Sequence, residues 1–382
     1  MLIQLAIMGL LAACLPLSVV WVSNDANKYR KLAWVTVFLT FDLVMFGAFT
    51  RLTDSGLGCP DWPGCYGHAN PLQAHEHISA AEAAMPTGPV TVAKAWIEMI
   101  HRYFAMAVGV LIIAMVVIAW RNWRRNRRTP TAEGSGGLAM PLLLFFFVCL
   151  QGAFGAWTVT LKLQPVIVTL HLLLGLTLLG LLAWHAARLS RHAPVGQAAA
   201  GLKLAAGAGL LLLALQIALG GWVSTNYAAL ACADFPLCQG TVVPPMDYQH
   251  GFTLWRELGK TGAGDYLPFA ALTAIHWTHR NFAFVVFAVV GWLAWRAGRV
   301  PGLERTARWL GLALALQLIT GLSTIFLNWP LAIAVAHNGG AALLLLLLTM
   351  LNFKIRLAGR PVSTLSCHAQ AAARSIHLPE SN

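Results

Sequence analysis

The stretch Leu150-Gln151-Gly152-Ala153-Phe154-Gly155 is followed, twenty residues after Gln151, by His171. The same order returns later in the chain. There Leu316-Gln317-Leu318-Ile319-Thr320-Gly321 is followed, twenty residues after Gln317, by His337. Self-similarity of this kind indicates a duplicated architecture in which each copy forms one structural unit. The two stretches therefore predict two halves with the same fold.

Two further landmarks repeat in the same order. Cys59-Pro60-Asp61-Trp62-Pro63-Gly64-Cys65 is echoed by Cys232-Ala233-Asp234-Phe235-Pro236-Leu237-Cys238. His101-Arg102-Tyr103-Phe104-Ala105 is echoed by His279-Arg280-Asn281-Phe282-Ala283. Because four predicted membrane crossings separate matching positions, both halves have one orientation, and their symmetry axis runs roughly along the membrane normal.

The composition is that of a polytopic membrane protein. Hydrophobic residues make up 58% of the 382 residues and charged residues only 10%, against about a quarter charged in soluble domains. Apolar runs of about 20 residues are long enough to cross a roughly 30 Å hydrocarbon core as helices. The predicted fold is all-α with nine crossings, over residues 2–22, 33–52, 96–120, 139–160, 166–186, 203–224, 269–295, 309–327 and 331–352.

The net charge of +12 is distributed unevenly. With the N-terminus outside, 19 of the 26 Lys and Arg residues fall in inner loops or the tail, and five in outer segments. This asymmetry is the positive-inside pattern, which sets the orientation and argues against nucleic-acid binding. The inner set is Lys28, Arg30, Lys31, Arg121, Arg124, Arg125, Arg127, Arg128, Arg188, Arg191, Lys203, Arg296, Arg299, Arg305, Arg308, Lys354, Arg356, Arg360 and Arg374.

The chain divides into four parts. Residues 1–32 form an extra N-terminal transmembrane helix and an inner loop, 33–187 an N-terminal four-helix bundle, 188–353 a C-terminal four-helix bundle, and 354–382 a disordered cytoplasmic tail. The first apolar run lacks a basic start and a clear cleavage site, which favours a retained helix over a signal peptide. Nothing resembles an organelle transit peptide, so we expect a bacterial cytoplasmic membrane.

Four histidines open the even-numbered helices of the two repeats near the outer face: His101, His171, His279 and His337. Haem iron takes two axial imidazoles, and two facing helices of a bundle can supply them. A lone histidine at this depth is as often an interfacial hydrogen bonder, but four at duplicated positions favour haem. Zinc or copper would need clustered Cys, Met or carboxylate partners at the same depth. His185 and His192 are expected at a solvated inner edge.

The residues beside the histidines differ between the halves. Glu98 lies three residues before His101, on the same helix face, whereas His276 holds that place before His279. Glu98 is either a proton acceptor beside a haem or an interfacial carboxylate. Arg102 and Arg280 follow the candidate ligands, and they either pair with haem propionates or snorkel to the interface.

The outer-loop cysteines fall in pairs six residues apart. In an oxidising compartment, Cys59–Cys65 and Cys232–Cys238 are candidate disulfides, and free or redox-active thiols are the alternative. Cys14, Cys149 and Cys367 are interpreted as structural or incidental.

From about Phe38 to Phe353 the chain resembles the haem A synthase family. The resemblance rests on Arg51-Leu52-Thr53-Asp54-Ser55-Gly56-Leu57, the Cys59–Cys65 loop, Glu98-Met99-Ile100-His101-Arg102, Thr169-Leu170-His171, Thr278-His279-Arg280 and Ala336-His337-Asn338. It implies an oxidoreductase that converts the C8 methyl group of haem O to the formyl group of haem A, with water as the oxygen source, for cytochrome c oxidase assembly.

The resemblance also implies roles for residues and partners. His101 and His171 would hold the substrate haem, His279 and His337 a haem b cofactor, and Glu98 would be the essential carboxylate. Cys59 and Cys65 match an outer-loop pair that can form a disulfide. Haem O, haem O synthase, oxidase assembly factors and membrane lipid are the expected partners. The electron acceptor and assembly as a homo-oligomer stay open, as does ligation by His276 in place of His279.

Two other functions fit the same residues. A dihaem cytochrome for electron transfer would need no carboxylate in only one half, so the difference between Glu98 and His276 argues against it. A transporter would be expected to show broken helices and a polar path, of which Asp42 is the only sign.

Overall fold

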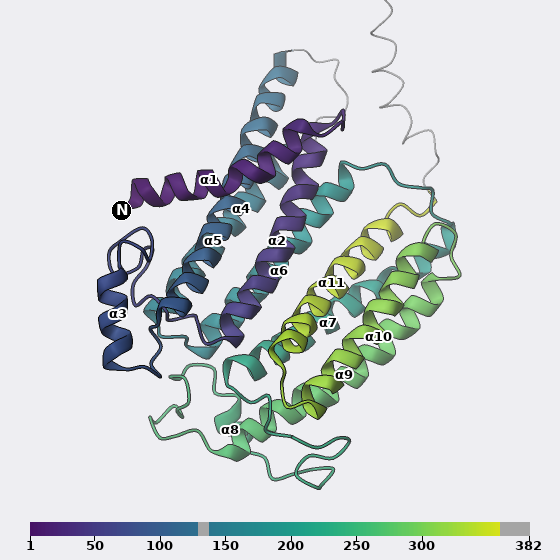
Figure 1. Ribbon diagram of the computed structural model, residues 1–382. Helices are drawn as coiled ribbons and strands as arrows, with labels where there is room; N and C mark the ends of the chain where they lie inside the picture. Colours follow the sequence, from purple (N-terminus) through teal and green to yellow (C-terminus); the bar gives the residue numbers. More distant parts are fainter. Residues whose placement is uncertain (129–136, 360–382) are drawn as a thin grey trace, which may run out of the picture.

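The computed structural model describes residues 1–128 and 137–359 (Figure 1). Of the predicted disordered tail 354–382, residues 354–359 are described and are ordered: α11 continues to Ile355, and Gly359 donates to the carbonyl oxygen of Val195. The rest, with Arg360, Cys367 and Arg374, lies outside the described residues. Within these ranges the chain forms nine long helices: α1 (Leu2–Val22), α2 (Lys28–Leu52), α4 (Val92–Arg128), α5 (Ala139–Thr160), α6 (Pro165–Arg188), α7 (Lys203–Thr225), α9 (Phe269–Ala297), α10 (Glu304–Phe326) and α11 (Leu331–Ile355).

The nine helices match the nine predicted spans, with differences at their ends. Helix α4 continues to Arg128 and α10 begins at Glu304, because charged residues such as Arg and Glu remain good helix formers beyond the apolar run. Eight of the nine are long and apolar enough to cross a membrane. Helix α9 has the length but is less apolar, since His276, His279 and Arg280 lie in its first half.

Three short helices in the loops were not predicted: α3 (His75–Ala84), α8 (Tyr248–Gly251) and the 3₁₀ turn η1 (Gln197–Leu202). Helices α3 and α8 belong to the long connections at one end of the bundles. We call this end, with residues 53–91 and 226–268, the loop end. The opposite end, where α4 finishes, is the arginine-rich end.

The long helices pack as two rings of four. In the first ring α2 contacts α4, α4 contacts α5, α5 contacts α6, and α6 returns to α2. The second ring runs in the same way through α7, α9, α10 and α11. Helix α1 lies outside the repeat, obliquely across α4 and α2 (Figure 1). The protein is therefore two tandem four-helix bundles with an added N-terminal helix, as the repeat predicts.

The two bundles share one apolar core, in which α6 packs on α7 and on α11, and α2 packs on α11. At the loop end a polar link joins them. Arg51 donates to the carbonyl oxygen of Ser224 (2.6 Å), and its guanidinium lies 4.2 Å from the ring centre of Tyr227. The Tyr227 hydroxyl donates to Asp54 (2.6 Å).

This link marks the position of the symmetry axis. Arg51 and Ser224 each lie eight residues before the first loop cysteine of their half, and Asp54 and Tyr227 each lie five before it. Matching positions of the two halves therefore touch one another, as residues near a two-fold axis must.

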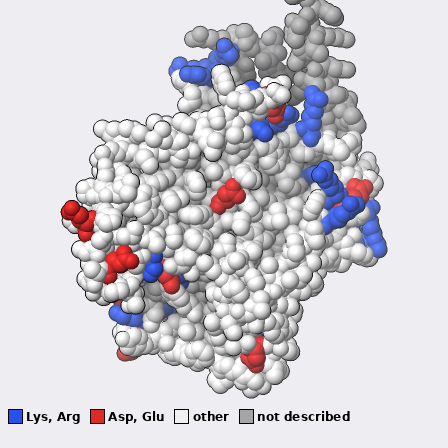
Figure 2. All heavy atoms as spheres, in the orientation of Figure 1, with Lys and Arg blue, Asp and Glu red and all other residues white. Residues whose placement is uncertain are grey.

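Charged side chains are concentrated at the ends of the bundles. Figure 2 shows Lys and Arg side chains gathered toward the arginine-rich end, and a broad, nearly uncharged middle on the same face. An apolar belt of this kind is what helices surrounded by lipid present.

Candidate functional site

The two predicted ligands of each bundle stand on diagonally opposite helices. His101 is on α4 and His171 on α6, which are separated in their ring by α2 and α5. His279 on α9 and His337 on α11 have the same relation in the second ring. Side chains from diagonal helices approach the bundle interior from opposite sides, which is how two axial imidazoles must reach one iron.

The imidazole ring of each of the four histidines packs against a glycine of a neighbouring helix. A methyl group on Gly47 would lie 3.0 Å from Nε2 of His101, and one on Gly155 would lie 3.4 Å from Cε1 of His171. In the second bundle the corresponding glycines stand next to the rings of His279 and His337. The distances there are 2.9 Å for Gly220 and 3.0 Å for Gly321. Glycine lets the neighbouring backbone come this close. All four imidazole rings therefore share one feature, a close contact with a glycine of the next helix.

Glutamines hold the ligand-bearing helices in place. Gln151 donates to the carbonyl oxygen of His171 (2.9 Å), and Gln216 donates to that of His279 (3.1 Å). The amide nitrogen of Gln216 also lies 3.1 Å from Nδ1 of His279. Sequence reasoning used Gln151 only as a landmark of the repeat and missed Gln216, because Leu43 occupies the matching place in the first half.

His337 has polar neighbours at both ring nitrogens. The amide nitrogen of Gln317 lies 3.3 Å from its Nε2, and the hydroxyl of Thr320 lies 3.0 Å from its Nδ1. By contrast, Nδ1 of His171 is buried without a hydrogen-bond partner among the described residues. A buried imidazole nitrogen without a partner is costly unless something else binds its lone pair.

The donor set fits haem iron. In residues 1–128 and 137–359 no group of three or more His, Cys, Asp or Glu side chains is placed to hold a bare metal ion. Each bundle instead offers two half-buried histidines from diagonal helices. Two imidazoles are the number that a haem iron needs as axial ligands.

Glu98 connects the first ligand helix to the disulfide loop. Its side chain is 4% exposed, and it accepts a hydrogen bond from the backbone N–H of Cys59 (2.8 Å) and another from Arg102 (2.6 Å). Arg102 also donates to the carbonyl oxygens of Pro63 and Gly64. The carboxylate and the guanidinium thus clamp the Cys59–Cys65 loop onto α4.

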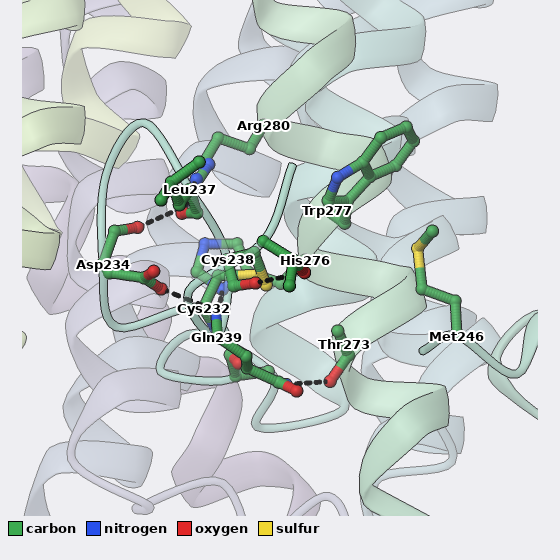
Figure 3. Close-up of a disulfide and its surroundings, with 12 residues drawn as sticks. Cys232, Asp234, Leu237, Cys238, Gln239, Met246, Thr273, His276, Trp277 and Arg280 are labelled. Carbon is green, nitrogen blue, oxygen red and sulfur yellow. Dashed lines mark hydrogen bonds between the residues drawn. A yellow bond between two sulfur atoms is a disulfide. The ribbon is translucent and has the colours of Figure 1, made fainter. Parts of the chain in front are cut away.

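His276 makes the corresponding connection in the second half (Figure 3). Its Nδ1 accepts from the backbone N–H of Cys232 (3.2 Å). Arg280 donates to the carbonyl oxygens of Asp234 (2.7 Å), Pro236 (2.8 Å) and Leu237. The hydrogen bond to the first loop cysteine is conserved between the halves, although a carboxylate has been exchanged for an imidazole.

These contacts bear on the two alternatives left open by the sequence. Arg102 and Arg280 donate to the loops, which favours a supporting role over a bond to haem propionates. His276 has Nδ1 directed at the loop, whereas His279 leans on α7 at Gly220. His279 is therefore the better placed of the two to reach the bundle interior.

Both cysteine pairs are joined as disulfides, Cys59–Cys65 and Cys232–Cys238. Each loop also holds an aspartate that accepts from two backbone N–H groups, Asp61 from Tyr66 and Gly67, and Asp234 from Gln239 and Gly240 (2.8 Å each). The hydrogen bonds from Gly240 and Gln239 hold the pKa of the Asp234 carboxyl below its usual value. Sequence reasoning treated both aspartates only as parts of the repeat.

One expectation for the arginine-rich end was wrong. His185 is not solvated: its side chain is buried, and its Nε2 lies 3.0 Å from the hydroxyl of Tyr29. The histidine reaches into the contact between α2 and α6, which the sequence could not show.

Residues 30–349 match the family described as cytochrome oxidase assembly protein. The chain belongs to this family. Among its relatives is the heme A synthase of Shewanella oneidensis, 38% identical over 329 residues, with 85% of this chain and 96% of that protein covered. The heme A synthase of Methylobacterium sp. strain 4-46 is 31% identical over 363 residues, covering 87% and 95%.

A third relative, the heme A synthase of Rhodopseudomonas palustris strain HaA2, is 28% identical over 328 residues, covering 80% and 84%. The family match begins at residue 30, after α1. The added helix therefore lies outside the shared region, whereas both bundles and all four histidines lie within it.

Proposed function

We propose that this protein converts haem O to haem A by oxidising the C8 methyl group to a formyl group, in support of cytochrome c oxidase assembly. The observation that carries the haem part of the proposal is the pair of half-buried histidines on diagonal helices, present once in each bundle. Relatives named heme A synthase, aligned over most of the chain, support the reaction.

We assign the substrate haem to the first bundle, with His101 and His171 as iron ligands. A haem b cofactor would occupy the second bundle, with His279 and His337 as ligands. The difference between the halves supports this division, because Glu98 adds a carboxylate beside the first pair only. Two bundles used for electron transfer alone would have no need of that difference.

The reaction requires proton transfer near the methyl group. Each of two oxidations removes two electrons and two protons and places an oxygen atom from water on the carbon, and loss of water then leaves the aldehyde; the four electrons must pass to an external electron acceptor. An ionised carboxylate has about four acceptor positions. Cys59 and Arg102 use two of those on Glu98, so the remaining ones can accept a proton from an attacking water. Haem b, when bound, supplies one-electron redox capacity.

Location and partners follow from the same reasoning. The arginine-rich end would face the cytoplasm of a bacterial cell, by the positive-inside rule. The N-terminus and the disulfide loops would then lie outside, where disulfides persist. Haem O synthase and oxidase assembly factors are the expected partners.

Haem extraction tests the proposal. The protein would be expressed with a source of haem O, and extracted haems would be separated by chromatography, beside the variants His101→Ala and Glu98→Gln. A His192→Ala variant is a matched control, since His192 lies at the arginine-rich end and bonds to the carbonyl oxygen of Ala187.

Haem A is expected from the wild type and from His192→Ala, and unconverted haem O from the other two variants. Wild-type protein that left haem O unchanged while its haems cycled reversibly would indicate a dihaem cytochrome. Full conversion by Glu98→Gln would show that Glu98 is not the proton acceptor.

A further inference from the structure

A groove of about 580 Å³ lies between α9 and α10, away from the histidines. It extends along α9 from Phe287 to the helix end at Ala297 and reaches Arg299 just beyond it. The helical part lies eight to eighteen positions beyond His279, so roughly 12–27 Å farther along the helix at 1.5 Å per residue. The groove is therefore separate from the candidate haem site and reaches the arginine-rich end.

The walls of the groove are apolar for most of their length. Phe287, Leu312 and Leu314 line it together with the small residues Gly291 and Gly311. A methyl group on Gly311 would meet nothing within 4 Å, so the groove is open beside this residue. Gly311, Leu312 and Leu314 belong to α10, which is long and apolar enough to cross a membrane, and α9 packs beside it. An apolar chain that enters the groove from the side would therefore be a lipid chain.

Positive charge collects where the groove meets the arginine-rich end. Arg299 and Arg308 both line it, and the guanidinium of Arg299 lies 3.8 Å from the ring centre of Trp295. Within the described ranges neither arginine forms an ion pair with an acidic side chain. Glu304 also lines the groove at this end, and its carboxylate accepts a hydrogen bond from the backbone N–H of Gly302.

The first repeat has an arginine at the position that matches Arg299. Arg121 follows His101 by twenty residues, as Arg299 follows His279. It lines a second hollow of about 540 Å³ at the same end of α4, beside Trp120 and Arg124. Trp and Arg side chains gather at the level of lipid headgroups, so both copies place an arginine at that level. Among the described residues, the groove of the second copy continues from this arginine along the apolar residues Phe287, Leu312 and Leu314.

We propose that the groove between α9 and α10 is a binding site for an anionic phospholipid. One acyl chain would lie along Phe287, Leu312 and Leu314, and the phosphate would lie between Arg299 and Arg308. Basic pockets between transmembrane helices on the cytoplasmic side bind acidic headgroups in this way, and the guanidinium group suits phosphate because it offers paired donors.

Lipid titration followed by native mass spectrometry tests the site. The purified holoprotein would be delipidated in detergent and titrated with phosphatidylglycerol or, separately, with phosphatidylcholine. Arg299→Gln and Arg308→Gln, singly and together, remove the charge. Gly311→Leu fills the apolar part while leaving both arginines. Arg305→Gln is the matched control, since Arg305 lies in the same helix start but outside the groove lining.

One phosphatidylglycerol is expected to bind more tightly than phosphatidylcholine. Each arginine removed should weaken its binding about 5-fold, and the pair together about 25-fold, because a basic residue near an acidic headgroup contributes on the order of 1 kcal/mol. Gly311→Leu should lose the bound lipid, and Arg305→Gln should keep it.

Equal binding of the two lipids, or equal losses in Arg305→Gln and in the groove variants, would show that only the ordinary lipid annulus is present. Haem content measured on the same samples reports folding. It also keeps this test separate from the proposed function, since no groove residue touches the four histidines.

Discussion

Substituting Gly220 by alanine tests the contact between α7 and the ring of His279. The added methyl group would lie 2.9 Å from Cε1 of His279 and 3.4 Å from Nδ1. Ordinary van der Waals contact begins near 3.4 Å, so the ring or the helix must shift by at least 3.4 minus 2.9, or 0.5 Å. Overpacking of this kind typically costs about 1–3 kcal/mol.

The cost should appear in haem retention. A cost of 1–3 kcal/mol corresponds to a loss of affinity of about 5- to 150-fold. We expect purified Gly220→Ala protein to retain less haem per chain than the wild type, with the loss in the second bundle. The remaining haem should show the optical spectrum of a weakened axial ligand.

Gly207→Ala is the matched control. Gly207 lies on the same helix, and a methyl group there would meet nothing within 4 Å, so haem content should be unchanged. Gly47→Ala, next to His101, should instead reduce the haem of the first bundle. Wild-type haem content and spectrum in Gly220→Ala would refute both the contact and the assignment of His279 as a ligand.

Three further predictions concern parts of the fold around the site. Acid should loosen the second disulfide loop. The pKa of Asp234 is lowered in the folded protein, so its stabilising effect is complete above the unfolded value of about 3.9 and is lost as the pH falls through the lower folded value. Reduction of the loop disulfide by a phosphine should therefore speed up in acid, and less so in Asp234→Asn. Arg51→Gln should lower the melting temperature, because it removes the donor to the second bundle and the stacking on Tyr227, at about 1–3 kcal/mol. Tyr29→Phe should also lower it, because it leaves His185 buried without its hydroxyl partner, again at about 1–3 kcal/mol.

Each of these predictions has an outcome that contradicts it. Equal acid acceleration in the wild type and in Asp234→Asn would mean that the aspartate does not hold the loop. A melting temperature unchanged by Arg51→Gln would mean that the polar link is not needed to hold the bundles together. Unchanged melting of Tyr29→Phe would place water or another donor at His185.

The sequence by itself determined the helices and their duplication. Hydrophobic runs of about 20 residues are legible without tertiary information, because lipid forces every backbone polar group to be satisfied within its own helix. The equal spacing from Gln151 to His171 and from Gln317 to His337 then identified which helices of the two halves correspond. Among the long helices only the ends were displaced, as at Arg128 and Glu304, where the helix continues beyond its apolar run. The short helices α3, α8 and η1 were missed because they have no such run.

The tertiary structure alone decided what the side chains around the histidines do. On sequence grounds Arg102 and Arg280 either pair with a haem propionate or snorkel to the interface, and the structure instead shows them donating to loop carbonyls. The same holds for Glu98 and His276, whose shared partner is the backbone N–H of a loop cysteine.

The physical reason is that helices depend on local composition, whereas the contacts around the histidines join residues far apart in the chain. The local composition of a single sequence is enough to predict the length of a membrane helix and its burial in lipid. A hydrogen bond between residues 39 or 44 positions apart, as between Glu98 and Cys59 or His276 and Cys232, depends on how loops return over the bundle. No local pattern records that return, so a carboxylate and an imidazole can fill one structural position and look unrelated until the fold brings each to its loop.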